Sequence, residues 1–154
     1  MNRLDLKLLE LVQQNNRLTA EELSDSVGLS PSACQRRLKR LREEGVIVAD
    51  VSVVAPEALG RRLTMIVQVT LERERPDLID TFKRSMIATP EVMQCFYVTG
   101  DADFVMILTV KDMKDYEDFT KRFFIENSNI QRFNTIVVMD WVKAGLQVPI
   151  AEDA

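Results

Sequence analysis

The spacing of apolar residues changes near Gly45, and this change limits the fold more than any other feature of the chain. Before Gly45 the apolar residues recur at helical intervals, as Leu4, Leu8 and Leu11 do. After it, residues 62–72 alternate strictly between apolar and mostly polar side chains, which is typical of a half-buried strand. The sequence therefore predicts an α+β chain with a helical N-terminal part and a sheet in the C-terminal part.

Three short helices are predicted before Gly45, and their ends are marked. Residues 19–22 form a capping box, Ser30-Pro31 starts the third helix, and Gly45 can take the left-handed position after it. Only Gly28-Leu29-Ser30 separates the second helix from the third, which is typical of a helix-turn-helix. Spacing alone also fits another kind of small helical bundle. The predicted buried positions are Leu4, Leu8, Leu11, Leu23, Val27, Cys34, Leu38 and Leu41.

The rest of the chain predicts a second domain built around a sheet. Residues 46–48 and 51–54 resemble two short strands, and residues 55–61, bracketed by Pro56 and Gly60, form the best linker. Then follow a strand at 62–72, a helix from Pro76 to Thr89-Pro90, strands at 92–99 and 103–110, a helix capped by Asp112 and a strand at 130–142. This order predicts a ferredoxin-like βαββαβ domain over 62–142, which follows the helix-turn-helix domain over 1–54 and precedes a short tail over 143–154.

Residues 32–42, SACQRRLKRLR, concentrate five cations in a chain whose net charge is −4. On the third helix, a cationic face opposite the apolar one suits the DNA major groove, which admits one α-helix. The alternative is an ordinary solvated face with Arg37 and Arg42 lying over the core. We expect Ser32, Gln35 and Arg36 to reach base edges and Lys39 and Arg40 to contact phosphate. With Ser30 at the cap, the candidate DNA-binding residues are Ser30, Ser32, Gln35, Arg36, Lys39 and Arg40.

Composition excludes several kinds of site. The chain has no histidine, and Cys34 and Cys95 stand far apart without CxxC spacing, so we expect no metal site, no cofactor and no catalytic residues. Cys34 shares the apolar face of its helix and is interpreted as a core residue rather than a reactive thiol. No signal peptide or membrane span is recognised, so we expect a cytoplasmic protein.

Three stretches together resemble the Lrp/AsnC family of feast-or-famine transcription factors. They are Leu4-Asp5, VGLSPSACQRRLKRLREEGVI over residues 27–47, and VTGDADFVMILTVKDMKDYEDF over residues 98–119. The resemblance implies an N-terminal winged helix-turn-helix joined by a hinge strand to a C-terminal domain that binds a small molecule, commonly an amino acid. It also implies dimers, often assembled into octamers around which double-stranded DNA bends.

The same resemblance implies an effector site between subunits, near the loop after the second strand of the C-terminal domain. It indicates Thr99, Gly100, Asp101 and Asp103, with Thr135 and Val137 contributed by a neighbouring chain. A glycine lets backbone amides approach an α-carboxylate, and an aspartate offsets an ammonium group. Gly100-Asp101 alone would also fit an ordinary strand connection.

Two other functions share this architecture. One is a nucleoid-architectural protein that bends DNA without an effector. The other is an enzyme similar to siroheme decarboxylases, which depend on histidine and are therefore disfavoured here. Binding to random duplexes with and without amino acids would separate the first from a regulator.

Apolar residues occupy both faces of the predicted sheet. Residues 103–110 carry Phe104 and Met106 on one parity and Val105 and Ile107 on the other, and Ile136 and Val138 repeat this pattern. Two helices cover only one face, so the other face needs a partner. The sequence therefore predicts a two-fold homodimer formed through the C-terminal domain.

Overall fold

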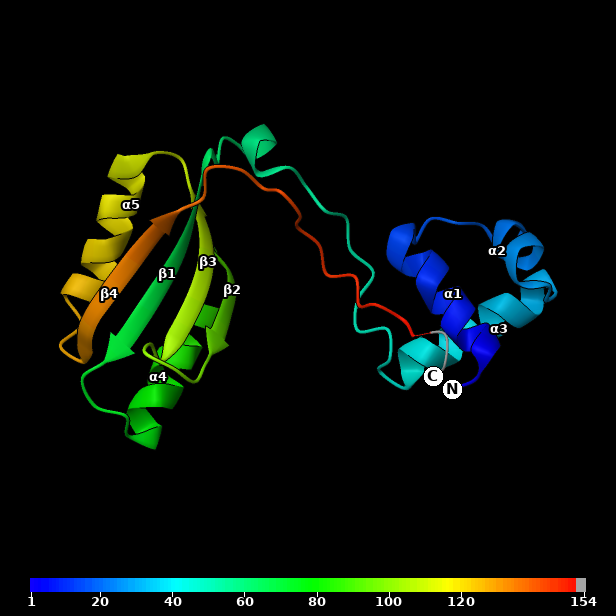
Figure 1. Ribbon diagram of the computed structural model, residues 1–154, viewed down its shortest axis with the longest axis horizontal. Coiled ribbons are helices and arrows are strands. Elements are labelled where there is room, and N and C mark those ends of the chain that lie inside the picture. Colours follow the sequence, from blue (N-terminus) through cyan, green and yellow to red (C-terminus); the bar gives the residue numbers. More distant parts are fainter. Residues whose placement is uncertain (152–154) are drawn as a thin grey trace. The chain divides into compact units, whose positions relative to one another are not determined.

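The computed structural model describes residues 1–151 and shows two compact units (Figure 1). One unit contains Met1–Val53 together with the C-terminal segment from Lys143 onward, and the other is Val54–Val142. Each unit encloses its own cluster of buried apolar residues. The regular elements of residues 1–151 are helices and one antiparallel sheet, which confirms the predicted α+β class.

The first unit holds three helices, α1 (Arg3–Gln14), α2 (Ala20–Val27) and α3 (Pro31–Glu43). Thr19 and Glu22 form the predicted capping box of α2, and the Ser30 hydroxyl accepts the N–H of Ala33 at the start of α3. Gly28 has a φ of 75°, a left-handed conformation that L side chains rarely adopt, and this lets the chain leave α2 sharply. The predicted helix-turn-helix is confirmed.

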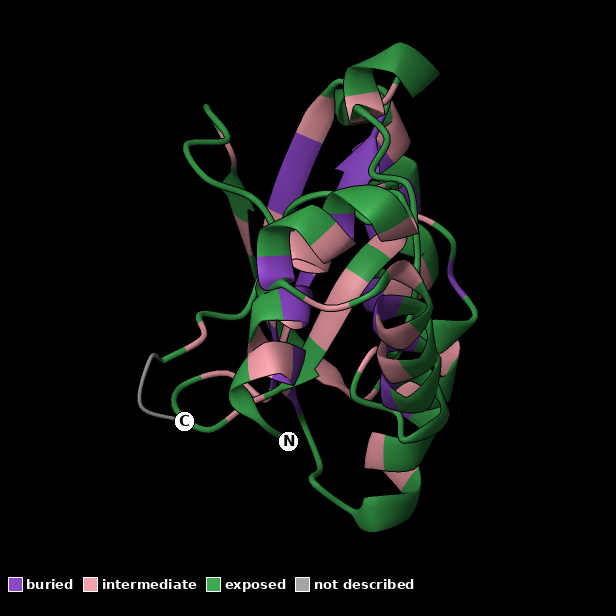
Figure 2. Ribbon diagram, turned by 90° about the vertical axis from the view of Figure 1, so that its right-hand side faces the viewer, coloured by how far each residue is buried: buried purple, intermediate pink, exposed green. Residues whose placement is uncertain are grey.

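The core of this unit lies where the three helices meet. Its buried apolar residues are Leu8, Leu23, Val27, Cys34, Leu38 and Leu41. The predicted burial of Cys34 is thus confirmed, whereas Leu4 and Leu11 are only partly buried. In Figure 2 the helices carry buried residues, in purple, on one side and exposed residues, in green, on the other.

The two short strands predicted at 46–48 and 51–54 are wrong, since the structure assigns no strand between α3 and residue 55. The N–H groups of Val46 and Ile47 both donate to the Leu41 carbonyl, so they complete the end of α3 instead of a ladder. The side chains of Val48 and Val53 are 90% and 93% exposed. Two short strands without a third partner are at best marginally stable in water, which explains the difference.

The C-terminal segment belongs to the helical unit. The N–H of Val148 donates to Gln13 Oε1 at 2.7 Å, and Gln13 Nε2 donates to the Val148 carbonyl at 3.1 Å. The side-chain amide of α1 therefore holds the backbone of this segment from both sides. The last three residues of the predicted tail, 152–154, lie outside the described part of the chain.

The second unit is a four-stranded antiparallel sheet in the order β2-β3-β1-β4. Its elements are a short 3-10 turn η1 (Pro56–Leu59), β1 (Leu63–Leu71), α4 (Pro76–Ile87), β2 (Val92–Tyr97), β3 (Phe104–Val110), α5 (Met113–Thr120) continued by the π turn η2 (Lys121–Ile125), and β4 (Ile130–Val137). This order and this topology confirm the predicted ferredoxin-like arrangement.

Both long helices cover the same face of the sheet. Phe82 of α4 and Phe119 of α5 belong to one buried cluster with residues such as Val67 and Met106 of the central strands. The opposite face is apolar along the middle, because Ile66 of β1 pairs with Ile107 on one side and with Ile136 on the other. No helix in the described part of this unit lies on that face. We call this surface, which also includes Phe96 and Val105, the open face.

Two strands end at least two residues earlier than predicted. β4 ends at Val137 rather than 142, because Val138 makes the last ladder bond to Thr64 near the start of β1 and no neighbouring strand continues beyond it. β2 ends at Tyr97 rather than 99, because the Val98 N–H turns to the Asp103 carbonyl and closes the loop to β3. The predicted Asp112 cap of α5 is confirmed by its bond from the Asp115 N–H at 2.8 Å.

No helix within residues 1–151 combines the length and the apolar character that crossing a membrane requires.

Candidate functional site

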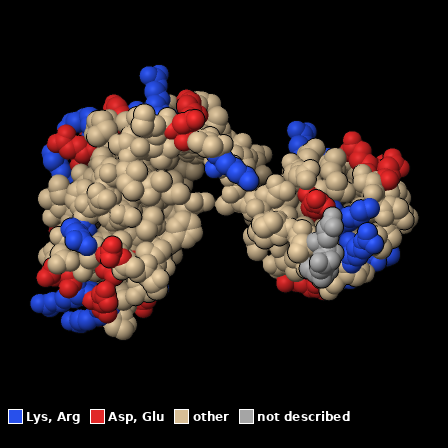
Figure 3. All heavy atoms as spheres, in the orientation of Figure 1, with Lys and Arg blue, Asp and Glu red and all other residues tan. Residues whose placement is uncertain are grey.

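The third helix presents a polar side to solvent. Cys34, Leu38 and Leu41 are buried, while Ser32, Gln35 and Arg36 are exposed near its N-terminal end. The Ser30 hydroxyl, which caps the helix, lies 3.3 Å from the Ser32 hydroxyl. In the space-filling view, basic side chains gather over this part of the helical unit, whereas the two signs of charge are mixed on the sheet unit (Figure 3). An exposed basic helix face of this kind can enter a DNA groove.

A buried aspartate joins α3 to α1. Asp5 of α1 is 1% exposed, and its two carboxylate oxygens lie 2.9 Å from Arg37 Nη1 and 2.8 Å from Arg40 Nη2. Burial acts to raise the pKa of Asp5, but the N–H of Asn2 and the two guanidinium groups outweigh it and lower this pKa. The pair of ion bridges joins α1 to α3 and sets the orientation of α3.

This geometry refines the roles expected on α3. Arg40, predicted to contact phosphate, uses part of its guanidinium on Asp5, although its side chain remains 46% exposed. Lys39 is exposed and only 3.7 Å from Glu43, which is a weak surface pair. Arg36 makes no ion pair with any residue in the described range 1–151. Arg36 and Lys39 are therefore the cations most available to a partner.

The last cation of the basic stretch is also held inside the unit. Arg42 donates to both carboxylate oxygens of Asp50, at 2.8 and 3.0 Å. The hydrogen bonds between them raise the pKa of Arg42 and lower the pKa of Asp50. In the alternative interpretation Arg37 and Arg42 lie over the core, and the structure shows that each also pairs with a carboxylate, Arg37 with Asp5 and Arg42 with Asp50.

The predicted effector loop joins β2 to β3. Thr99, Gly100 and Asp101 are exposed, and Gly100 has a φ of 116°, which favours glycine. Asp103 is partly buried, and its carboxylate accepts the Leu71 N–H at 2.7 Å while its own N–H donates to the Val69 carbonyl. Asp103 therefore fastens the loop to the end of β1, and this structural use was not predicted.

A second carboxyl group lies beside Asp103. This group belongs to Glu74, which follows β1. The hydrogen bond between Asp103 and Glu74 and the negative charge of Asp103 raise the pKa of Glu74. The loop is therefore flanked by two acidic groups that interact. Sequence reasoning missed Glu74, because nothing in the local pattern shows that the end of β1 meets the loop before β3.

The other two predicted effector residues lie elsewhere in the chain. Thr135 pairs with Val67 in the middle of β1, and Val137 pairs with Met65 toward the end of β1 away from the loop. The Thr135 hydroxyl bonds to the hydroxyl of Tyr116 on α5. One chain thus does not bring Thr135 and Val137 to residues 99–103.

The described residues contain no cluster of three or more His, Cys, Asp or Glu side chains that could hold a metal ion. Cys34 and Cys95 are free thiols, and burial raises the pKa of Cys95.

A helix-turn-helix with a basic outer face, followed by a ferredoxin-like unit, defines a class of two-domain DNA-binding proteins. Residues 1–48 match the family model for winged helix-turn-helix DNA-binding, and residues 64–148 match the Lrp/AsnC ligand binding domain. The chain belongs to the Lrp/AsnC family of transcriptional regulators.

Individual relatives agree with this assignment. The chain is 64% identical over 150 residues to an HTH-type transcriptional regulator of Sinorhizobium fredii, covering 97% of this chain and 89% of that protein. It is 32% identical to the leucine-responsive regulatory protein of Escherichia coli K12, covering 93% and 87%. Among solved structures, a Neisseria meningitidis transcriptional regulator in complex with L-methionine aligns with a TM-score of 0.91 at 31% identity, covering 97% and 96%.

Proposed function

We propose that this regulator reads specific DNA sequences through the exposed side of α3 and that a free amino acid controls its assembly or its DNA binding. The observation that carries the proposal is the fixed α3, whose exposed side is polar and basic while Asp5 ties Arg37 and Arg40 of this helix to α1. A helix held in this way presents its side chains in one orientation, which base readout requires.

The contacts divide along the helix. Ser32, Gln35 and Arg36 lie near its N-terminal end, where recognition helices reach base edges, and Arg36 can grip a guanine with two donors. Lys39 and the free part of Arg40 lie further along and suit phosphate. Ser30 acts mainly as the N-cap of α3, because its hydroxyl accepts the N–H of Ala33.

The working unit is a homodimer formed through the open face. Ile66, Ile107 and Ile136 form a continuous apolar row across three strands, and Phe96 and Ile136 are 49% and 42% exposed in the single chain. A second copy packed on this row removes it from water and doubles the number of α3 helices. The family resemblance extends this assembly to an octamer.

The effector site is the loop of residues 99–103, completed by Thr135 and Val137 of another chain. Its exposed glycine and aspartate can bind the carboxylate and ammonium ends of an amino acid. The Neisseria meningitidis relative with bound L-methionine supports an amino acid as the ligand class. We further propose that the protein is cytoplasmic and has no catalytic role.

Calorimetry with the twenty amino acids, followed by DNA titration with and without the amino acid that binds, tests this function. Asp101→Ala should lose amino-acid binding at the loop, while its DNA affinity without ligand should match the wild type. DNA binding without sequence preference and without any amino-acid effect would instead favour the nucleoid-architectural alternative.

A further inference from the structure

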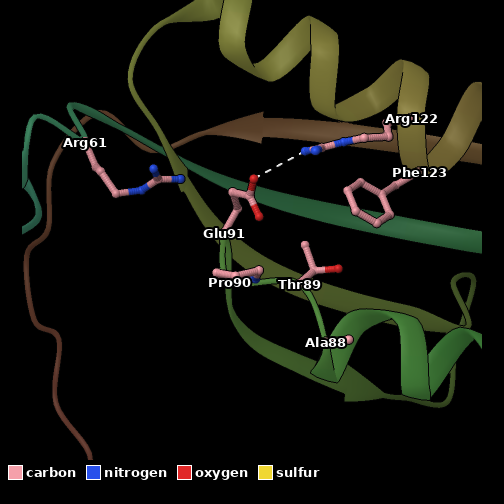
Figure 4. A pocket seen from close by; sticks show the side chains of 7 residues that line it. All are labelled: Arg61, Ala88, Thr89, Pro90, Glu91, Arg122 and Phe123. Atoms are coloured by element: carbon pink, nitrogen blue, oxygen red, sulfur yellow. Dashed lines mark hydrogen bonds and ion pairs between the residues drawn. The ribbon is translucent and has the colours of Figure 1, made fainter.

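A cavity of about 540 Å³ opens in the sheet unit, away from the effector loop. Figure 4 shows that its lining comes from three segments: Arg61 before β1, the residues after α4 that include Thr89 and Glu91, and Arg122 with Phe123 of η2. Its volume lies within the range of small-molecule sites, roughly 300–1,000 Å³. Nothing in the sequence pattern brings these three segments together.

Contacts within the protein hold two cations at this cavity. Arg122 Nη2 lies 3.2 Å from Glu91 Oε1, and the guanidinium carbon of Arg122 is 4.8 Å from the ring centre of Phe123. Arg61 Nε donates to the Thr109 hydroxyl at 2.8 Å, and its Nη2 donates to the Thr109 carbonyl. An arginine has five N–H donors, so both side chains keep donors for a ligand.

Negative charge at the cavity comes from Glu91, a carboxylate with 27% of its side chain exposed. The last carbonyl groups of α4 are already used, because Arg84 accepts from the Ala88 N–H, Met86 from the Thr89 N–H and Ser85 from the Thr89 hydroxyl. The cavity therefore offers positive charge at Arg61 and Arg122, negative charge at Glu91, and an apolar surface at Phe123.

We propose that this cavity is a second ligand site and that it binds a free α-amino acid. The carboxylate lies toward Arg61 and Arg122, the ammonium group toward Glu91, and the side chain against Phe123. This assignment rests on the proposed function, in which the protein senses amino acids. The cavity and the effector loop lie at opposite ends of β3, since Arg61 bonds Thr109 whereas the loop ends at Asp103. One chain thus carries two separate amino-acid sites.

Calorimetry of the full-length protein with each of the twenty amino acids tests the site. We expect two binding events per chain for at least one amino acid in the wild type. Arg122→Gln should weaken one event by about tenfold or more, because it removes a charge-assisted contact to the carboxylate. Lys121→Gln is the matched control, because it removes the same charge from the neighbouring residue, which pairs with Glu117 outside the cavity lining.

The ammonium contact has its own test. Glu91→Gln should weaken binding of the amino acid about tenfold. Binding of the corresponding carboxylic acid, which lacks the amino group, should be unaffected. Equal effects on the two ligands, or no effect of Arg122→Gln, would overturn the proposal, as would the absence of binding by every amino acid.

The two proposed sites fail in different ways. If Asp101→Ala abolishes all binding, the cavity does not bind amino acids and the loop of residues 99–103 is the effector site. If Arg122→Gln abolishes all binding while Asp101→Ala has no effect, the cavity binds the amino acid and the assignment of the effector site to the loop is wrong.

Discussion

The two units of this protein differ in how complete their candidate sites are within one chain. The helical unit places all of its candidate DNA contacts on α3 and fixes that helix internally through Asp5. The sheet unit leaves its open face uncovered, and Thr135 and Val137 lie on β4, which β1 separates from β3. The proposed DNA contacts of one α3 therefore come from one chain, whereas the proposed site at the loop of residues 99–103 needs residues of a second chain.

The largest expected effect is on assembly. Ile107→Asp places a charge in the middle of the open face, so we expect the dimer to weaken by about a hundredfold or more, ~3 kcal/mol. Light scattering at micromolar concentration measures the change. Ile87→Asp is the control, because Ile87 is 85% exposed at the end of α4, on the helix-covered side. A monomeric wild type would contradict the proposal that a second copy covers the open face of the sheet unit.

The next effect tests whether the helical unit depends on its buried ion pairs. Asp5→Asn leaves Arg37 and Arg40 without their carboxylate, and we expect a loss of about 1–3 kcal/mol in the free energy of unfolding of this unit. Hydrogen exchange of the amides of α1 and α3 reports this loss locally. Asp50→Asn is the control, because its pair with Arg42 is 40% exposed and should contribute less than about 1 kcal/mol.

The same pair predicts a dependence on pH. The native contacts lower the pKa of Asp5, so their stabilisation is present above the unfolded pKa of about 3.9 and is lost as the pH falls through the lower folded value. The free energies of unfolding of the wild type and of Asp5→Asn should therefore converge as the pH falls through that lower folded value. Curves that stay parallel from pH 7 to pH 2 would show that Asp5 does not act through its charge.

Sequence reasoning predicted local features well. The caps at Thr19 and Ser30 and the buried side of α3 depend on residues three or four positions apart, and all of them are confirmed. Asp5 meets Arg37 across 32 positions, so no periodic pattern could show that bond. The strands at 46–54 failed because Val46 and Ile47 bond to Leu41 instead. The cavity of Arg61, Glu91 and Arg122 was not predicted for the same reason of distance in sequence.

A smaller effect separates phosphate contacts from helix positioning. Lys39→Ala should weaken all DNA sequences evenly and reduce the slope of log affinity against log salt by about 0.9. Arg40→Ala should reduce this slope by a similar amount and also loosen the exchange protection of α1, because Arg40 bonds Asp5. Fluorescence anisotropy over a salt series gives both slopes. Identical behaviour of the two variants in both assays would contradict the division of roles.

The smallest expected effect concerns Thr135. Thr135→Val leaves the Tyr116 hydroxyl without its partner, so we expect a loss of about 1 kcal/mol in stability. Urea unfolding measures this loss, and calorimetry on the same variant shows whether Thr135 also contacts ligand. Unchanged stability together with lost ligand binding would show that Thr135 serves the ligand rather than α5.

Selection of bound duplexes from a random DNA library tests the central claim most directly, because the claim is that the exposed side of α3 reads sequence. The wild type should select one pseudo-palindromic site, and Arg36→Ala should lose preference at one position in each half-site, by about 1–3 kcal/mol. Arg84→Ala, an exposed arginine on α4, should select the wild-type site. If Arg36→Ala selects the same sequences with unchanged affinity and salt dependence, α3 is not the reading helix.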